Sequence, residues 1–224
     1  MNAASTRRFP GPVRILLLSI VISLAPCFVL AQAADAASDA PHERFAAGHY
    51  PAAASYPEAL ARWKGADDIN AWIGAKFQYD RARALQLSET QRDRNGRMPI
   101  HEPQDFFVAP AGVCVDLAHF AVETLRRLEP ATRPRYLMIE FDPVTIQGNT
   151  LRRHWVTLYQ RAGGLYFFAD SKRPGHVAGP YASVDDYIAD YTRYRGRVIV
   201  AWREMDSYAR TMRTRAVRQE RATP

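Results

Sequence analysis

Three residues of this chain have the types and the order that covalent acyl transfer requires. Cys114 stands in the sequence GVCVD, His154 in RHWV and Asp170 in FADS. The chemistry needs a nucleophile, a base that takes its proton and a carboxylate that orients the base. The alternative is a buried cysteine that only packs, which is the commoner role of a single cysteine.

The first 33 residues have the features of a secretory signal peptide. Arg7, Arg8 and Arg14 form a positive region, residues 15–25 are apolar, and residues 31–33 read Ala-Gln-Ala, a small-residue cleavage site. We therefore expect a periplasmic or secreted protein. The alternative is an uncleaved anchor, and membrane contact is expected only in that case.

Cleavage would leave Cys114 as the only cysteine, because Cys27 lies inside residues 1–33. Exported proteins tend to use cysteines in pairs, so a lone thiol is either well buried or kept for its reactivity. Cleavage also removes three arginines and no acids, which lowers the net charge from 30 − 23 = +7 to 27 − 23 = +4. Much of that excess lies in the tail, so the basic pI does not indicate a nucleic-acid partner.

The remaining chain is long enough for one domain with a substantial core. Residues 34–56 are rich in Ala, Pro and Ser and predict a loosely ordered lead-in. The domain is expected over 57–205, and a basic C-terminal tail over 206–224. Helical spacing runs from Pro57 to Tyr79 with a break near Gly65. Residues 84–110 are polar and contain Asn95-Gly96 and several prolines, which predicts a long, irregular and functional loop.

The second half of the domain predicts an α+β arrangement. Residues 114–128 form the clearest helix, with apolar residues on one face and charged residues on the other. Three strands are expected at 135–142, 153–160 and 164–171. A helix is expected at 181–194 and a fourth strand at 197–203.

Cys114 falls in the first turn of its predicted helix. The free N–H groups there and the positive end of the helix dipole would favour a thiolate. The same N–H groups could form half of an oxyanion hole. Gln78 is a weaker candidate for a second, side-chain donor, and a solvated glutamine is the alternative.

His154 and Asp170 lie on consecutive predicted strands. The segment Arg161-Ala162-Gly163 fits a three-residue hairpin loop, which would pair Gln160 with Gly164 and bring His154 directly opposite Asp170. Opposite side chains have Cβ atoms about 4.5–5.5 Å apart, within reach of a hydrogen bond. A slip of one residue would separate the two faces.

Together these motifs resemble the transglutaminase-like superfamily, in its bacterial cysteine-peptidase branch. The pattern is Gly-x-Cys opening a helix, a His-x-Trp-Val type of strand, and an aromatic-rich strand ending in Asp; here these are GVCVDLA, HWVTLY and YFFAD. The resemblance covers roughly residues 65–175. It implies a papain-like core, with the catalytic cysteine at a helix N-terminus packed on an antiparallel sheet, and a Cys114–His154–Asp170 triad.

We therefore expect an exported cysteine hydrolase that forms a thioester acyl-enzyme, with a protein or peptide as substrate. The word peptidase comes from the resemblance alone. The alternatives are acyl transfer to an amine and a non-catalytic binding module on the same fold. No cofactor or metal is expected, since four histidines show no metal-ligand spacing: His42, His49, His101 and His176. Asp116 is expected to be a local hydrogen-bond acceptor, and His119 to face solvent.

Overall fold

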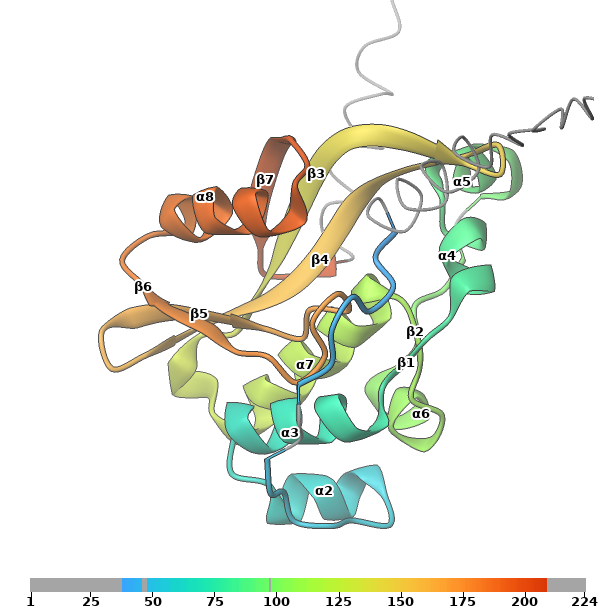
Figure 1. The fold of residues 1–224 in the computed structure, drawn as a ribbon. Coiled ribbons are helices and arrows are strands. Elements are labelled where there is room, and N and C mark those ends of the chain that lie inside the picture. Colours follow the sequence, from blue (N-terminus) through green and yellow to red (C-terminus); the bar gives the residue numbers. More distant parts are fainter. Residues whose placement is uncertain (1–37, 46–47, 97, 209–224) are drawn as a thin grey trace, which may run out of the picture.

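The computed structural model describes residues 38–45, 48–96 and 98–208. An antiparallel five-stranded sheet forms its centre, in the order β6-β5-β4-β3-β7, with helices against it (Figure 1). The mixture of helices and one antiparallel sheet confirms the α+β class. The predicted signal peptide and most of the basic tail lie outside the described residues. No helix within the described residues is long and apolar enough to span a bilayer.

Two helices lie between residues 56 and 76, before the candidate catalytic residues, and the break predicted between them is present. α2 spans Tyr56–Arg62 and α3 spans Ala66–Lys76. Ser55 caps α2 by accepting a hydrogen bond from the backbone N–H of Glu58 at 3.3 Å. A Cβ atom at Gly65 would lie 1.9 Å from the Glu129 carboxylate, which accepts a hydrogen bond from the backbone N–H of Ala66, so a larger residue would displace this carboxylate from the start of α3.

The prediction of an irregular loop at residues 84–110 is wrong. The segment contains short helices: α4 spans Arg81–Gln86, α5 spans Glu89–Asn95 and α6 spans Pro103–Val108. Side-chain caps stabilise the first two, because Asp80 accepts from the N–H of Arg83 and Ser88 from that of Gln91. These helices are too short for an apolar periodicity to be visible in the sequence.

Two of the expected strands are longer than predicted, the one expected at 164–171 ends three residues earlier, and the one expected at 197–203 is shifted by two residues. β3 spans Arg135–Ile146 and β4 spans Asn149–Arg161; they form a hairpin about a turn at Gln147 and Gly148, both with positive φ. β5 spans Gly164–Phe168 and β7 spans Ile199–Met205. β6, at Ala178–Tyr181, was not predicted. β7 pairs with β3 at one edge of the sheet, and β6 pairs with β5 at the other.

The predicted register between β4 and β5 is wrong by one residue. Arg161 pairs with Gly164, so the loop has two residues, Ala162 and Gly163, with φ of 47° and 78°. Positive φ at both central residues is the signature of a type I′ turn, whose twist matches that of the strands. The ladder ends at Thr157 and Phe168, so His154 has no partner on β5.

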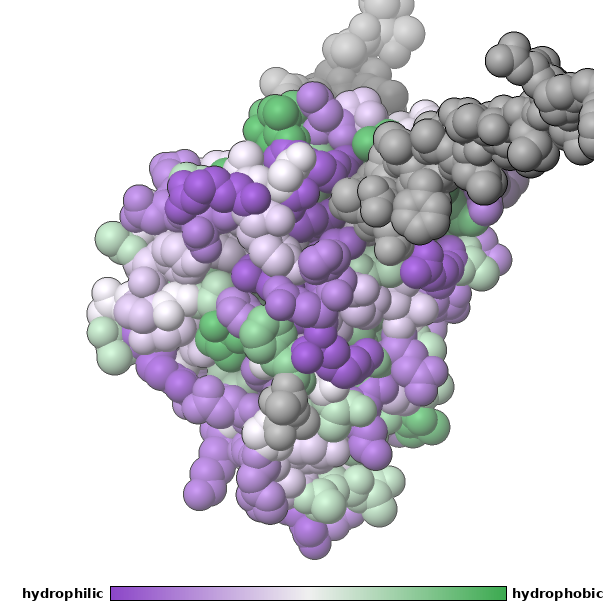
Figure 2. Space-filling model, viewed as in Figure 1, coloured by the Kyte–Doolittle hydropathy of each residue, from purple (hydrophilic) through white to green (hydrophobic). Residues whose placement is uncertain are grey.

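Helices cover both faces of the sheet. α7 has its predicted bounds, Cys114–Leu128, and packs against Tyr136 and Trp155. α8 spans Val184–Arg195 and covers the opposite face, where Tyr187 stacks on Phe167 with ring centroids 3.7 Å apart. The surface in Figure 2 is mostly hydrophilic, and its apolar residues lie in small separate groups.

A two-stranded parallel sheet leads into α7. β1 is Gln78–Tyr79 and β2 is Ala111–Gly112, and the backbone N–H of Asp80 donates to the Gly112 carbonyl at 2.8 Å. This short ladder joins the end of the α3 region to the residues just before Cys114. It therefore fixes where α7 begins.

Candidate active site

The first turn of α7 is held by a buried carboxylate. Asp116 accepts hydrogen bonds from the backbone N–H groups of Val113 and His101, each at 3.0 Å. Arg83 donates to both of its carboxylate oxygens, at 2.8 and 2.7 Å. Asp116 is thus the local acceptor that the sequence indicated, and its contact with Val113 fixes the backbone just before Cys114. Cys114 itself is buried, with 6% of its surface exposed.

His154, on β4, is fully buried and hydrogen-bonded to Asp170. Its Nε2 lies 2.9 Å from the Asp170 Oδ1 atom. Because a carboxylate can only accept, Nε2 carries the proton, and Nδ1 is the nitrogen left to exchange a proton with another group. The ring of Tyr191 on α8 stacks on the imidazole, with centroids 5.8 Å apart. The imidazole is therefore fixed in both position and orientation.

Asp170 reaches His154 although the predicted strand pairing is wrong. β5 ends at Phe168, and Ala169 takes a left-handed φ of 56°, which turns the chain out of the ladder. Asp170 Oδ1 also accepts from the backbone N–H of Lys172 at 2.8 Å, and Oδ2 lies 3.3 Å from Arg173 Nε. The hydrogen bond between His154 and Asp170 forms because this turn compensates for the shift in strand register.

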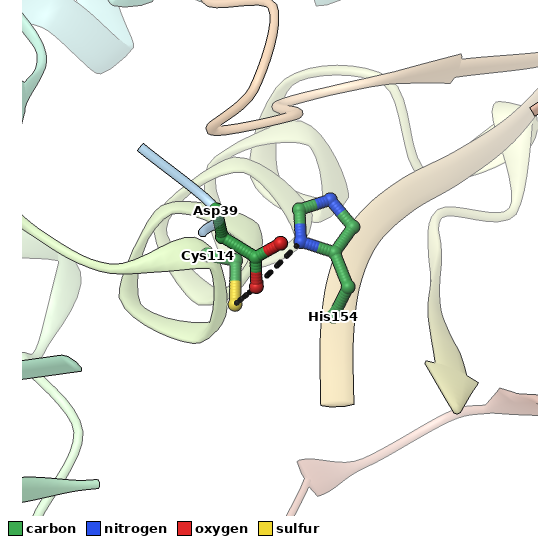
Figure 3. A group of neighbouring side chains, drawn as sticks. All are labelled: Asp39, Cys114 and His154. Carbon is green, nitrogen blue, oxygen red and sulfur yellow. Dashed lines mark hydrogen bonds and ion pairs between the residues drawn. The ribbon is translucent and has the colours of Figure 1, made fainter. Parts of the chain in front are cut away.

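A fourth group, Asp39, lies between the nucleophile and the base, and sequence reasoning missed it. Its Oδ2 atom is 3.2 Å from His154 Nδ1 and 3.8 Å from Cys114 Sγ, whose thiol donates to it (Figure 3). Its Oδ1 atom accepts from Arg195 at 2.8 Å. The sulfur, a ring nitrogen of His154 and an Asp39 oxygen all lie within 4.8 Å of one another. The site therefore contains one nucleophile, one imidazole and two carboxylates.

The charges in this arrangement disfavour the expected thiolate. Burial raises the pKa of the Cys114 thiol, and the Asp39 carboxylate adds to that effect, while His154 opposes it. Burial alone would lower the pKa of His154, but Asp39 and Asp170 outweigh it and raise the pKa well above its ordinary value. The expectation of a thiolate is thus wrong for this arrangement, because Asp39 takes the position of the anion beside the imidazolium.

Both carboxylates are held in the ionised form. Burial would raise the pKa of Asp170, but the hydrogen bond and charge of His154, with Arg173, lower it. For Asp39, burial is likewise outweighed by His154 and Arg195, and the pKa is lowered. Two buried arginines and an imidazolium therefore face two carboxylates and a neutral thiol, which leaves the cluster with a formal charge of 3 − 2 = +1.

Asp39, Cys114 and His154 are also the residues that could hold a metal ion. Their oxygen, sulfur and nitrogen atoms are ligand types that Zn²⁺ accepts, and Asp170 would orient the histidine from behind. However, the second oxygen of Asp39 is hydrogen-bonded to Arg195. The buried guanidinium already neutralises that carboxylate and would repel a dication bound beside it.

Gln78 and His119, also singled out in the sequence, have other contacts. Gln78 is exposed on β1, paired in the ladder with Ala111. His119 is half-buried, not solvated as expected, because its Nδ1 atom lies 2.8 Å from the Tyr136 hydroxyl. A surface hollow of about 620 Å³ at the β4–β5 turn includes none of the site residues in its lining.

Neither Asp39 nor Arg195 carries a signal that could have identified it in the sequence. Asp39 stands in a segment rich in Ala and Pro, without periodicity or motif. Arg195 is in the last turn of α8, where a cation is expected simply to complement the helix dipole. Only the fold brings these two residues, 156 positions apart, into contact.

No model of a known protein family matches the chain, and no curated protein is similar to it. The assignment of a function therefore rests on the geometry and chemistry of the site.

Proposed function

We propose that the protein is an exported cysteine hydrolase that acts on a protein or peptide through a Cys114–His154–Asp170 triad. One observation carries the proposal: a buried imidazole is bonded through Nε2 to a carboxylate, and a nitrogen of the same ring lies within 4.8 Å of the sulfur of a buried cysteine, with an Asp39 oxygen near both. A cysteine kept only for packing needs no oriented histidine beside it. The resemblance to transglutaminase-like peptidases, with their papain-like core, agrees with this assignment.

The proposed reaction has two halves. Once the Asp39 carboxylate has moved away and Nδ1 has released its proton to solvent, the Cys114 thiol gives its proton to His154 Nδ1 while Sγ bonds to the substrate carbonyl carbon. The carbon–nitrogen bond then breaks, and Nδ1 returns the proton to the leaving amine. Water, deprotonated by the same nitrogen, hydrolyses the thioester and frees the thiol. Asp170 stabilises the imidazolium throughout and keeps Nδ1 toward the sulfur. The N–H groups in the first turn of α7 are the proposed oxyanion donors.

Two alternatives use the same residues. An amine that replaces water would make the protein a transglutaminase-type acyl transferase. A binding module without turnover is favoured by one specific observation, namely that an Asp39 oxygen lies near both Sγ and Nδ1. These alternatives differ in their products, not in the arrangement of the site.

The test incubates the mature protein with a mixture of periplasmic proteins and compares it with a Cys114→Ala control. New peptide fragments, absent from the control, are the expected result. Covalent species of higher mass would indicate transfer to an amine instead. If neither the parent nor an Asp39→Asn variant forms any product beyond that of the control, the catalytic proposal fails and the binding-module alternative replaces it.

A further inference from the structure

The segment that carries Asp39 lies along the loop that carries Asp170. Residues 38–45 contain no helix or strand, yet four hydrogen bonds join them to residues 171–174. The donor–acceptor pairs are His42 N to Lys172 O, Phe45 N to Pro174 O, Ser171 Oγ to Asp39 O, and Lys172 Nζ to Ser38 O, at 2.9–3.0 Å. The segment thus binds in the manner of an extended peptide in a groove, through its backbone.

Further contacts hold the C-terminal half of this segment. Arg44 donates to the carbonyl oxygens of Gly74 and Phe77, each at 2.7 Å. The Phe45 ring lies against His176, with centroids 4.6 Å apart. Ala40, next to Asp39, is 3% exposed. These contacts involve the segment along its whole length, so the position of Asp39 is fixed by the whole segment and not by its own side chain alone.

Asp39 occupies the space that a substrate needs. An acyl carbon must approach Cys114 Sγ to about 3–3.5 Å before reaction. The Asp39 carboxylate lies 3.8 Å from that sulfur and 3.2 Å from the nitrogen that must take its proton. A substrate can therefore react only after this carboxylate has moved away.

Arg195 is built to bind a carboxylate at this position. Its side chain is 1% exposed, and its guanidinium lies over the rings of Phe141 and Tyr191, at 4.8 and 5.7 Å from their centroids. It donates to the Tyr191 hydroxyl and to Asp39, while its buried Nε has no hydrogen-bond partner. When Asp39 leaves, this cation loses its closest counter-ion, which favours a ligand that supplies another carboxylate.

We propose that residues 38–45 are an internal ligand that closes the candidate site, and that Arg195 binds a carboxylate of the acidic peptide that displaces them. The proposal names the substrate class of the proposed hydrolase and in that respect rests on it. The segment and the substrate compete for the same contacts, along residues 170–175. An acidic side chain beside the reacting carbonyl gives a substrate the contact that Asp39 makes in the closed form.

The first test measures how fast iodoacetamide alkylates Cys114, by mass spectrometry of the peptide that contains it. Asp39→Asn keeps the shape of the side chain and removes its charge, and Glu43→Gln makes the same change at an exposed residue of the same segment. We expect Asp39→Asn to raise the alkylation rate at neutral pH by about tenfold or more, because a neighbouring anion disfavours the thiolate. Glu43→Gln should match the parent. Equal rates in the two variants would overturn the proposal.

The second test adds the segment back in trans to the full-length Asp39→Asn protein. The acetylated and amidated peptide SDAPHERF should protect Cys114 from alkylation. The same peptide with Asn in place of Asp should give half-protection only at an about tenfold higher concentration, because it lacks one charge-assisted hydrogen bond. Equal protection by the two peptides would show that Arg195 does not select a carboxylate. Arg195→Gln should abolish the difference, and the peptide comparison is decisive even if that variant does not fold.

Neither measurement needs turnover, so this proposal and the proposed function fail separately. Faster alkylation of Asp39→Asn with selective protection by the acidic peptide supports the internal ligand even if no substrate is ever cleaved. Conversely, cleavage by the parent at the rate of Asp39→Asn would support the hydrolase and contradict the internal ligand.

Discussion

Two aspartates lie on opposite sides of one imidazole, and they differ in how the chain holds them. Asp170 follows β5 directly, is 4% exposed at its side chain, and accepts a backbone hydrogen bond from Lys172. Asp39 belongs to a segment without regular structure and is 16% exposed. Both are paired with a buried arginine, Arg173 or Arg195. The same carboxylate group therefore has two different roles: Asp170 orients the imidazole, whereas Asp39 fills the space beside Cys114.

The largest expected effect comes from Asp170, the aspartate that orients the imidazole. Asp170→Asn keeps the shape of the side chain but offers an amide to Nε2, which favours the wrong imidazole tautomer. Turnover of any substrate found for the parent should fall by roughly 10⁴-fold. The measurement is the rate of product formation, with circular dichroism as the control for folding. Activity within a few-fold of the parent would remove Asp170 from the proposed triad.

A second prediction separates the two aspartates by their effect on stability. The pKa of His154 is raised in the folded protein, so its protonation stabilises the fold below the unfolded pKa of about 6.5, and this contribution is lost as the pH rises through the folded value. The free energy of unfolding should therefore fall above about pH 6.5, by at most about 1.4 kcal/mol per pH unit.

In Asp39→Asn the Asp39 charge no longer raises the pKa of His154, so this fall should end at a lower pH than in the parent. Urea unfolding between about pH 6.5 and about pH 9 measures the difference. Coincident pH profiles for the two proteins would mean that Asp39 does not stabilise the imidazolium.

The smallest expected effect concerns the contact between the two aspartate-bearing segments. Ser171 donates to the Asp39 carbonyl oxygen at 2.9 Å and is fully buried. Ser171→Ala removes one hydrogen bond, worth about 1 kcal/mol, from the segment and none from the Asp170 side chain. Alkylation of Cys114 should become a few-fold faster. A loss of alkylation would indicate that Ser171 supports the cysteine itself.

The sequence predicted the role of Asp170 but not that of Asp39. The helix at 114–128 and the strands that carry His154 and the residues before Asp170 are predicted by apolar periodicity, which is strong in long, half-buried elements. The pairing of His154 with Asp170 was predicted through a register that is wrong by one residue. It forms because Ala169 turns the chain with a positive φ, a feature that no residue pattern announces.

Asp39 could not be predicted for a different reason. Its segment is held by backbone hydrogen bonds and single side-chain contacts, none of which creates a period in the sequence. The short helices α4 and α5 were missed for a similar reason, since their stability comes from the caps at Asp80 and Ser88. Tertiary contacts of this kind become visible only once the fold is known.

The central claim is that Cys114 and His154 form a nucleophile–base pair that Asp39 interrupts. The most direct test is the pH dependence of Cys114 alkylation in Asp39→Asn and in Asp39→Asn/His154→Ala. We predict that the first variant reacts quickly well below the usual thiol pKa of about 8.5, and that the second reacts only as that pKa is approached. The same pH profile in both variants would contradict the claim.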